Sequence, residues 1–146
     1  EFNEYLLLIL LINSLGLKIQ KLNHFQDEAH LMNNIEIAKC FSLGQFSQID
    51  QYLDDNIIWD VIGENTFLGK LAVIEQTQKI ESYFQSVTHH FELDQIHLTD
   101  PFIIIQGQAS FQSSDQTTKI SACDIYEFNQ ASQIIKIQSY CITLKQ

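Results

Sequence analysis

Residues 53–63 read LDDNIIWDVIG, and this stretch places a carboxylate inside an apolar run. The polar triplet at 54–56 favours a turn, whereas residues 57–62 are rich in β-branched side chains and predict a strand. Side chains of a strand alternate between two faces, so Asp60 shares a face with Ile58. Ionised carboxylates are rarely buried without partners, because their desolvation is costly. We therefore expect Asp60 to point into an apolar pocket and to act as a base beside a nonpolar substrate.

Helical patterns flank this strand on both sides. Residues 71–87 predict the longest helix, with apolar side chains at a spacing of about 3.6 residues. Before the strand, residues 35–43 predict a short, mostly buried helix that ends at Gly44, and residues 46–53 carry a second helical stripe. Residues 63–69 are expected to form a loop.

The second half of the chain predicts four strands. They are expected at residues 89–98, 102–112, 118–129 and 133–144. The short polar gaps between them are typical of hairpin turns, which join antiparallel strands, because parallel strands need long crossovers. The predicted fold is therefore an α+β domain over residues 32–146, in which a curved antiparallel sheet carries the helices on one face.

The first 31 residues differ from the rest. The apolar block at 5–12 is shorter than the roughly 20 residues that span a bilayer, and Met32 is the one methionine. We expect residues 1–31 to be an extension that precedes the domain, either added by cloning or belonging to an upstream segment. The alternatives are a genuine N-terminal helix that covers an apolar surface, or a weak membrane anchor at residues 5–17.

Composition excludes several classes of partner. The net charge is -10, there is no arginine, and the lysines are scattered, so neither nucleic acid nor an anionic membrane surface is an expected partner. Cys40, Cys123 and Cys141 form no CxxC pair, which is typical of small core residues in a reducing compartment and favours a cytoplasmic location.

Motifs for bound groups are missing from the sequence. There is no GxSxG, no glycine-rich phosphate loop and no HExxH, and the histidines do not converge as three ligands would. We expect no cofactor and no metal.

Three pieces of the chain resemble a known superfamily. They are LDDNIIWDVIG, the FLGK at 67–70 with its following helix, and ACDIYEFN at 122–129. Over residues 33–144 the chain resembles the nuclear transport factor 2-like superfamily, and more narrowly the SnoaL-like group of polyketide cyclases and ketosteroid isomerases. The resemblance implies a cone-shaped fold with a pocket between the curved sheet and the helices.

The resemblance to ketosteroid isomerases implies roles for two aspartates. Asp60 matches the family's general base, and Asp124 matches a protonated aspartate that donates to an oxyanion. Such a pair would support cofactor-free isomerisation, cyclisation or dehydration of a small nonpolar carbonyl compound. The family's oxyanion tyrosine corresponds to Ile37, which makes steroid isomerisation itself less favoured than a related reaction.

Other side chains complete the predicted site. The expected ligand-binding residues are Trp59, Tyr52, Ile58, Phe84, His90, Tyr126 and Tyr140. Structural roles compete with these assignments. Asp60 could cap a loop amide near Gly63 or pair with Lys70 or a histidine, and Asp124 could accept a hydrogen bond from Ser139 or Tyr140.

Two other functions are open at this point. The chain could carry a small hydrophobic molecule without turnover, or it could be an interaction scaffold. As a scaffold it would form a homodimer through the sheet, and strands after residue 100 would supply apolar surface from Ile103, Ile105, Ile135 and Ile137.

Overall fold

The structure is a computed structural model that describes residues 31–145. The predicted extension at residues 1–31 therefore lies almost wholly outside the described residues and stays a prediction. The described elements are α2 (Asn34–Ser42), the 3-10 turns η1 (Phe46–Gln48) and η2 (Asp50–Tyr52), β1 (Leu53–Val61), β2 (Asn65–Leu68), α3 (Lys70–Ser86), β3 (Thr88–Thr99), β4 (Phe102–Ser113), β5 (Gln116–Phe128) and β6 (Ile134–Thr143).

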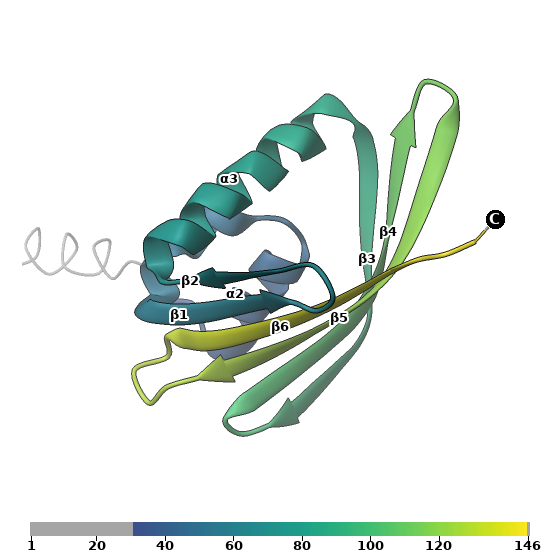
Figure 1. The fold of residues 1–146 in the computed structure, drawn as a ribbon. Coiled ribbons are helices and arrows are strands. Elements are labelled where there is room, and N and C mark those ends of the chain that lie inside the picture. Colours follow the sequence, from purple (N-terminus) through teal and green to yellow (C-terminus); the bar gives the residue numbers. More distant parts are fainter. Residues whose placement is uncertain (1–30, 146) are drawn as a thin grey trace, which may run out of the picture. The chain divides into compact units, whose positions relative to one another are not determined.

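The six strands form one curved sheet in the order β2-β1-β6-β5-β4-β3 (Figure 1). Strands β3 to β6 are an antiparallel meander, as predicted, and β2 pairs antiparallel with β1. Strand β1 is parallel to β6, because the whole meander and α3 lie between them in the chain and provide the long connection that parallel pairing needs. The α+β class and the curved sheet are confirmed.

Two local predictions around β1 are wrong. Residues 54–56 do not end an element but lie within β1, at a register shift between Leu53 and Ile58, where the Asp54 side chain accepts a hydrogen bond from the Asn56 amide. Residues 65–68 form an edge strand instead of a loop. This strand is too short to show an alternating pattern, and its pairing with β1 stabilises it.

Helix α2 has clear sequence signals at both ends. Asn33 and Glu36 form a reciprocal capping box at its start. Gly44 follows its end with a φ of 73°, in the left-handed region that glycine adopts without strain. Ile37 and Phe41 are buried on the face that packs against β4 and β5.

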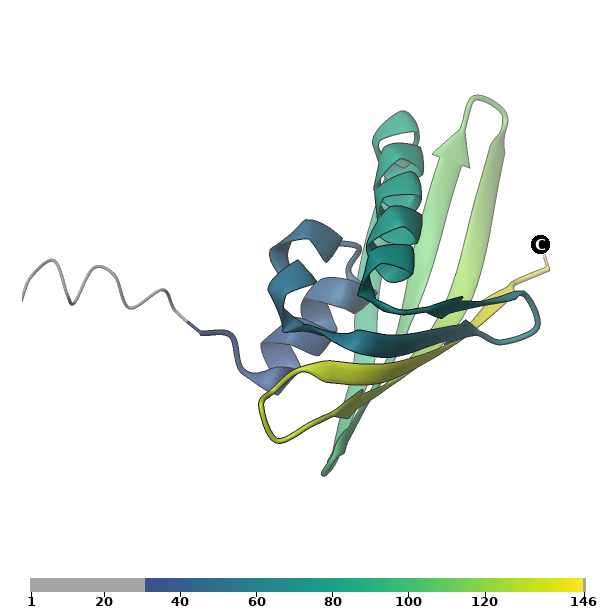
Figure 2. The same ribbon diagram turned by 60° about the vertical axis from the view of Figure 1, so that its left-hand side comes forward.

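Helix α3 starts directly after Gly69 and packs mainly on β1 and β2. Val73 and Thr77 are its buried residues, and Ile80 and Phe84 are partly buried further along the same face. The predicted second helix at residues 46–53 consists instead of the two 3-10 turns, which bring Phe46 and Tyr52 into the core. Figure 2 shows α3, α2 and these turns on the same side of the sheet.

The bend of the sheet depends on one close backbone approach. Strand β3 has a bulge between Leu93 and Gln95, opposite Gly107 of β4. A Cβ atom at Gly107 would lie 2.5 Å from the carbonyl oxygen of Glu92, so a side chain here requires a backbone shift. A bulge bends its strand and increases the local twist, and glycine allows the two backbones to approach. This bend makes the face toward the helices concave.

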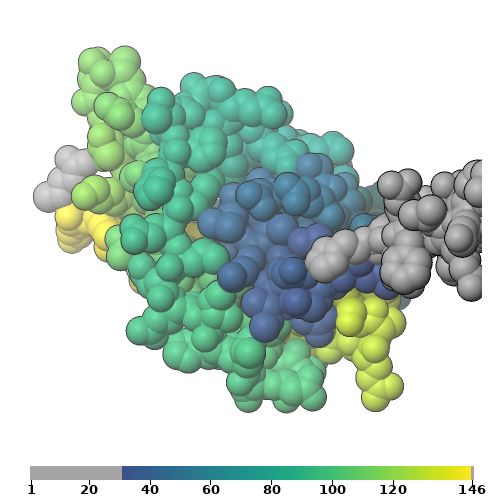
Figure 3. Space-filling view, turned by 180° about the vertical axis from the view of Figure 1, so that it is seen from behind, coloured from purple at the N-terminus to yellow at the C-terminus, as the bar shows by residue number. Residues whose placement is uncertain are grey.

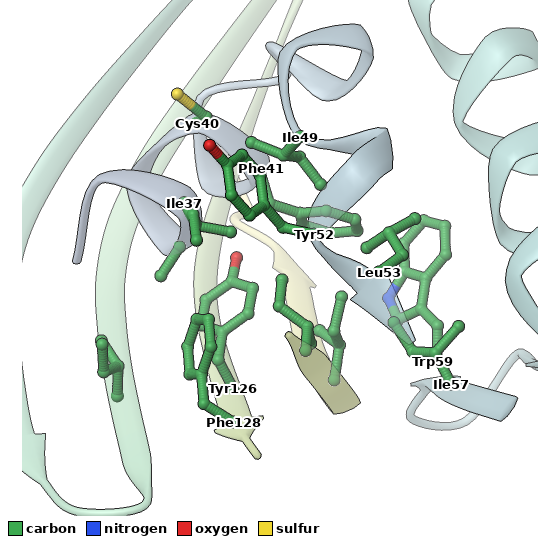
Figure 4. Close-up of a cluster of buried hydrophobic side chains, with 14 of the residues drawn as sticks. Ile37, Cys40, Phe41, Ile49, Tyr52, Leu53, Ile57, Trp59, Tyr126 and Phe128 are labelled. Atoms are coloured by element: carbon green, nitrogen blue, oxygen red, sulfur yellow. The ribbon is translucent and has the colours of Figure 1, made fainter. Parts of the chain in front are cut away.

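The hydrophobic core occupies one end of the concave face. Its side chains come from α2, the 3-10 turns and the inner face of the sheet, as Figure 4 shows, with Phe41 and Tyr52 above Tyr126 and Phe128. In the view from behind, the atoms of α2 and the turns (blue) lie between β3 (green) and the turn after β5 (yellow-green) and close this end (Figure 3). Among the described residues, no helix is long and apolar enough to cross a membrane.

Candidate functional site

A cavity of about 500 Å³ lies between the concave face of the sheet and the helices. Its wall is mainly apolar and rich in aromatic rings. These rings come from α2, η1 and α3 and from strands β1 to β4: Phe41, Phe46, Trp59, Phe67, Tyr83, Phe84, Phe91 and Phe111. Along β5 the side chains that face the cavity run from Thr118 at its open end to Asp124, which is only 9% exposed, at its closed end. A mostly apolar hollow with few polar groups is the usual form of a small-molecule site.

Asp124 is held at the closed end by three hydroxyl groups. The Ser139 hydroxyl donates to Oδ1 at 2.7 Å, and the Ser42 hydroxyl donates to Oδ2 at 2.7 Å. The Tyr126 hydroxyl lies 3.2 Å from Oδ2 and 2.6 Å from the Ser42 hydroxyl. The indole Nε1 of Trp59 donates to the Ser139 hydroxyl at 3.0 Å, which fixes the direction in which Ser139 donates. The network therefore joins α2, β1, β5 and β6 at one carboxyl group.

Burial dominates the electrostatics of this group. Desolvation raises the pKa of Asp124, although the hydrogen bonds from Ser139, Ser42 and Tyr126 act in the opposite direction. Burial and the neighbouring Asp124 raise the pKa of Tyr126 well above its usual range, so its hydroxyl keeps its proton. Asp124 is thus the group on which the charge of this network depends.

The cavity wall is poor in positive charge. Among the described residues that line it there is no lysine, arginine or histidine. Besides Asp124, Glu64 in the turn after β1 and Glu92 of β3 lie at the wall, and Cys141 of β6 faces the cavity two residues after Ser139. Burial, Asp124 and Glu64 raise the pKa of the Cys141 thiol to about 11. This thiol is therefore not an activated nucleophile, because only the thiolate reacts readily.

The predicted base is on the other face of the sheet. Trp59, which is 5% exposed, and Val61 line the cavity, whereas Asp60 alternates outward and accepts a hydrogen bond from the exposed Thr66 hydroxyl at 2.9 Å. The prediction that Asp60 points into the pocket is wrong. Ile58 and Ile62, which lie two residues before and after Asp60 and point to the same side, are each 38% exposed. They therefore form a half-exposed outer row and not a pocket wall. Among residues 31–145, neither a loop amide near Gly63, nor Lys70, nor a histidine is a partner of Asp60.

The predicted ligand-binding residues divide into three groups. Trp59 and Phe84 line the cavity. Tyr126 is fully buried and lies behind the wall, where it contacts the cavity only through Ser42 and Asp124. The others do not line it: Ile58 and Tyr140 project outward from the sheet, exposed His90 alternates away from Phe91, and the Tyr52 hydroxyl accepts a hydrogen bond from the Met32 amide.

Two serines of the site are absent from the predicted set. Ser139 is the register partner of Asp124 across the β5–β6 hairpin, so pairing the two predicted strands places it beside Asp124. It is also one of the two hydrogen-bond donors that the sequence offers as alternatives for Asp124. Ser42 is 82 residues from Asp124 in the chain, and no local pattern links the two. The Ile37 position, where related isomerases carry a tyrosine, is fully buried in the core, and Ser42 supplies a hydroxyl from the same helix.

Metal-binding geometry is not found in the described part of the chain. Residues 31–145 contain no group of three or more histidine, cysteine, aspartate or glutamate side chains that could hold an ion.

Comparisons with known proteins identify the fold. No family model and no curated protein sequence matches the chain. Among solved structures, an NTF2-like protein of unknown function from Cytophaga hutchinsonii is 30% identical, with a TM-score of 0.67 over 73% of this chain and 93% of that one. A protein assigned as a SnoaL-like polyketide cyclase from Shewanella denitrificans has a TM-score of 0.61 at 10% identity, over 75% of this chain and 90% of that one.

An LEH-like epoxide hydrolase from M. tuberculosis has a TM-score of 0.59 at 13% identity, over 75% of this chain and 82% of that one. The similarities to these two proteins, at 10% and 13% identity, show the fold alone. The 30% identity spans nearly the whole of the Cytophaga protein and agrees with the curved sheet, the helices on its concave face and the cavity between them. This chain belongs to the nuclear transport factor 2-like superfamily.

Proposed function

We propose that the chain binds a small, mostly nonpolar molecule in the cavity, with the polar group of that molecule against Asp124. The observation that carries this proposal is a buried carboxyl group at the closed end of a mostly apolar hollow of about 500 Å³. The apolar wall provides affinity through burial, and the carboxyl network provides orientation.

Trp59 provides the test, since it is the one tryptophan of the chain and lines the cavity. A nonpolar ligand that enters should change its fluorescence in a saturable manner. The Trp59 signal should respond less to the same ligand in Asp124→Asn and as strongly as wild type in Asp60→Asn, because the two carboxylates face opposite sides of the sheet. Equal loss in both variants, or no saturable binding of any nonpolar probe, would contradict the proposal.

Cofactor-free acid catalysis on a nonpolar carbonyl compound is a second candidate function. The raised pKa of Asp124 favours it, because a neutral carboxyl group can donate a hydrogen bond to a carbonyl oxygen and stabilise the charge that develops there. Asp60 cannot be the partner base in this cavity, so Asp124 would act without it. A rate that falls in Asp124→Asn while ligand affinity is retained would support catalysis, and a ligand recovered unchanged would support a carrier.

We also propose that the outer face of the sheet pairs with a second copy of the chain. Of the isoleucines expected to serve this contact, Ile103, Ile105 and Ile137 are buried in the core, and Ile135 is half-buried. Half-exposed or exposed apolar side chains of the outer face would serve it instead, namely Ile58, Tyr140 and Ile142. Sedimentation of wild type and of Ile142→Lys at several concentrations tests the proposal, with dissociation expected in the variant.

A further inference from the structure

The charged side chains that line the cavity are all acidic. Asp124 is buried with no lysine, arginine or histidine among the described lining residues, and Glu64 and Glu92 add two further carboxylates at the wall. Lys119 of β5 does not compensate, because its side chain alternates with the cavity-facing Thr118 and Ile120 and is exposed. An anionic ligand would therefore meet three acidic residues and no cation, which disfavours carboxylic acids and phosphate esters.

The hydrogen-bonding network at the closed end of the cavity offers a ligand an acceptor and no donor. The protons of Ser139 and Ser42 are donated to ionised Asp124, and the Tyr126 proton goes to Ser42 or to Asp124. Oδ1 of Asp124 accepts one hydrogen bond, from Ser139, although a carboxylate oxygen can accept two. While Asp124 is ionised, this network can accept a hydrogen bond from a ligand, but none of its hydroxyl groups has a proton to offer one.

Aromatic rings line the cavity beside this acceptor. Phe41 and Trp59 both line the cavity and meet edge to face with ring centroids 5.1 Å apart, and the indole of Trp59 reaches Ser139. Aromatic faces attract cations, and the attraction increases where water is excluded.

We infer that the cavity accepts a hydrophobic amine, bound as its ammonium ion with the nitrogen against Asp124 and the carbon skeleton along the aromatic wall. This inference rests on the proposed function and names its ligand class. The ammonium group supplies the donor that Oδ1 lacks and the counter-charge that the buried carboxylate lacks. Charge-assisted hydrogen bonds are roughly twice as strong as neutral ones, so an amine should exceed an alcohol of the same skeleton.

A matched ligand series tests the inference with the whole chain. Phenylbutylamine, phenylbutanol and phenylbutanoate share a skeleton and differ in the polar group. Calorimetric titration of the wild type at about pH 7.5 should rank the amine about tenfold above the alcohol, with the carboxylate weakest. In Asp124→Asn the amine should fall to the level of the alcohol, whereas Asp60→Asn should keep the wild-type order.

The possible outcomes separate the two proposals. If the amine and the alcohol bind equally, the inference is overturned while the proposed function stands. If none of the three probes binds, both are overturned. If the carboxylate binds best, the inference is overturned, because a cation must then reach the site.

A pH titration of the wild type keeps the test independent of any folding defect in Asp124→Asn. Amine affinity should rise with increasing pH as Asp124 ionises, while alcohol affinity should not rise. The other titratable groups near Asp124 are Tyr126, Cys123 and Cys141, whose pKa values are raised so that they keep their protons, and the cavity-lining Glu64 and Glu92. The variants Glu64→Gln and Glu92→Gln, both at exposed positions, control for these two carboxylates: each should keep the pH-dependent rise, and loss of the rise in either variant would overturn the assignment to Asp124.

Discussion

Asp124 and Asp60 lie on neighbouring rows of the same sheet but on opposite faces. Asp124 pairs in register with Ser139, which pairs with Val61, so the row of Asp124 passes directly beside Asp60. One carboxyl group is buried and receives three hydroxyl groups, and the other is partly exposed and receives one. A shift of one residue along a strand exchanges its faces, so one position in the chain separates a candidate site from a solvated surface.

The largest difference between the two faces should appear in their apolar residues. Trp59→Ala empties the wall of the cavity and removes the donor to Ser139, and we expect it to lower the free energy of unfolding by about 3 to 5 kcal/mol. Ile58→Ala, one residue away but 38% exposed, should lower it by about 1 kcal/mol. Denaturant unfolding of the two variants measures both values. Equal losses would mean that the outer face is as buried as the inner one.

The two aspartates should differ next. Asp124→Asn brings an amide with two protons against three hydroxyl donors, so at least one donor loses its acceptor, at a cost of about 2 kcal/mol. Asp60→Asn keeps an acceptor for Thr66 in contact with water and should change the stability by less than about 0.5 kcal/mol. Thermal and denaturant unfolding of the pair at neutral pH provide the comparison, and a reversed order would contradict the assignment of faces.

A smaller effect is expected in the way the free energy of unfolding depends on pH, and of the two aspartates only Asp124 should produce it. Its pKa is raised in the folded state by burial, so the folded protein binds this proton more tightly than the unfolded chain does. The folded state therefore carries a cost above the raised pKa, and this cost disappears as the pH falls toward the ordinary aspartate value of about 3.9.

The measurement is the difference between wild type and Asp124→Asn at each pH, because other groups contribute equally to both. Wild type should gain stability relative to the variant as the pH is lowered through the raised pKa of Asp124 toward the ordinary aspartate value of about 3.9. A gain in the opposite direction would mean that the hydrogen bonds from Ser139, Ser42 and Tyr126 outweigh burial and that the carboxylate is the favoured form.

The parts of the fold that the sequence predicts are those with local causes. The four-strand meander follows from β-branched runs and short polar turns, and α2 and α3 follow from periodicity and from Gly44 and Gly69 beside them. The edge strand β2 has no local signal, because it is stabilised by pairing with β1. The 3-10 turns carry an apolar stripe like that of a helix, and tertiary packing of Phe46 and Tyr52 decides between the two.

The candidate site follows less directly from the sequence. Alternation shows that Asp60 and Trp59 oppose each other, but both rows of β1 are apolar, so the pattern does not say which row faces inward. The large indole of Trp59 and its hydrogen bond to Ser139 settle this in the structure. Asp124 was predicted and does reach the cavity, whereas Ser42 reaches it through a contact between distant parts of the chain.

The smallest expected effect is at the outer face, in Thr66→Ala. This change removes the hydrogen bond to Asp60, but water replaces it at an exposed site, so we expect a loss of less than about 0.5 kcal/mol at low protein concentration. A second copy seated on the outer face would bury this pair and make the lost bond more costly. Unfolding measured at increasing protein concentration therefore tests the proposed pairing: the cost of Thr66→Ala should grow if the outer face becomes an interface, and a constant small cost would leave Asp60 on a free, hydrated surface.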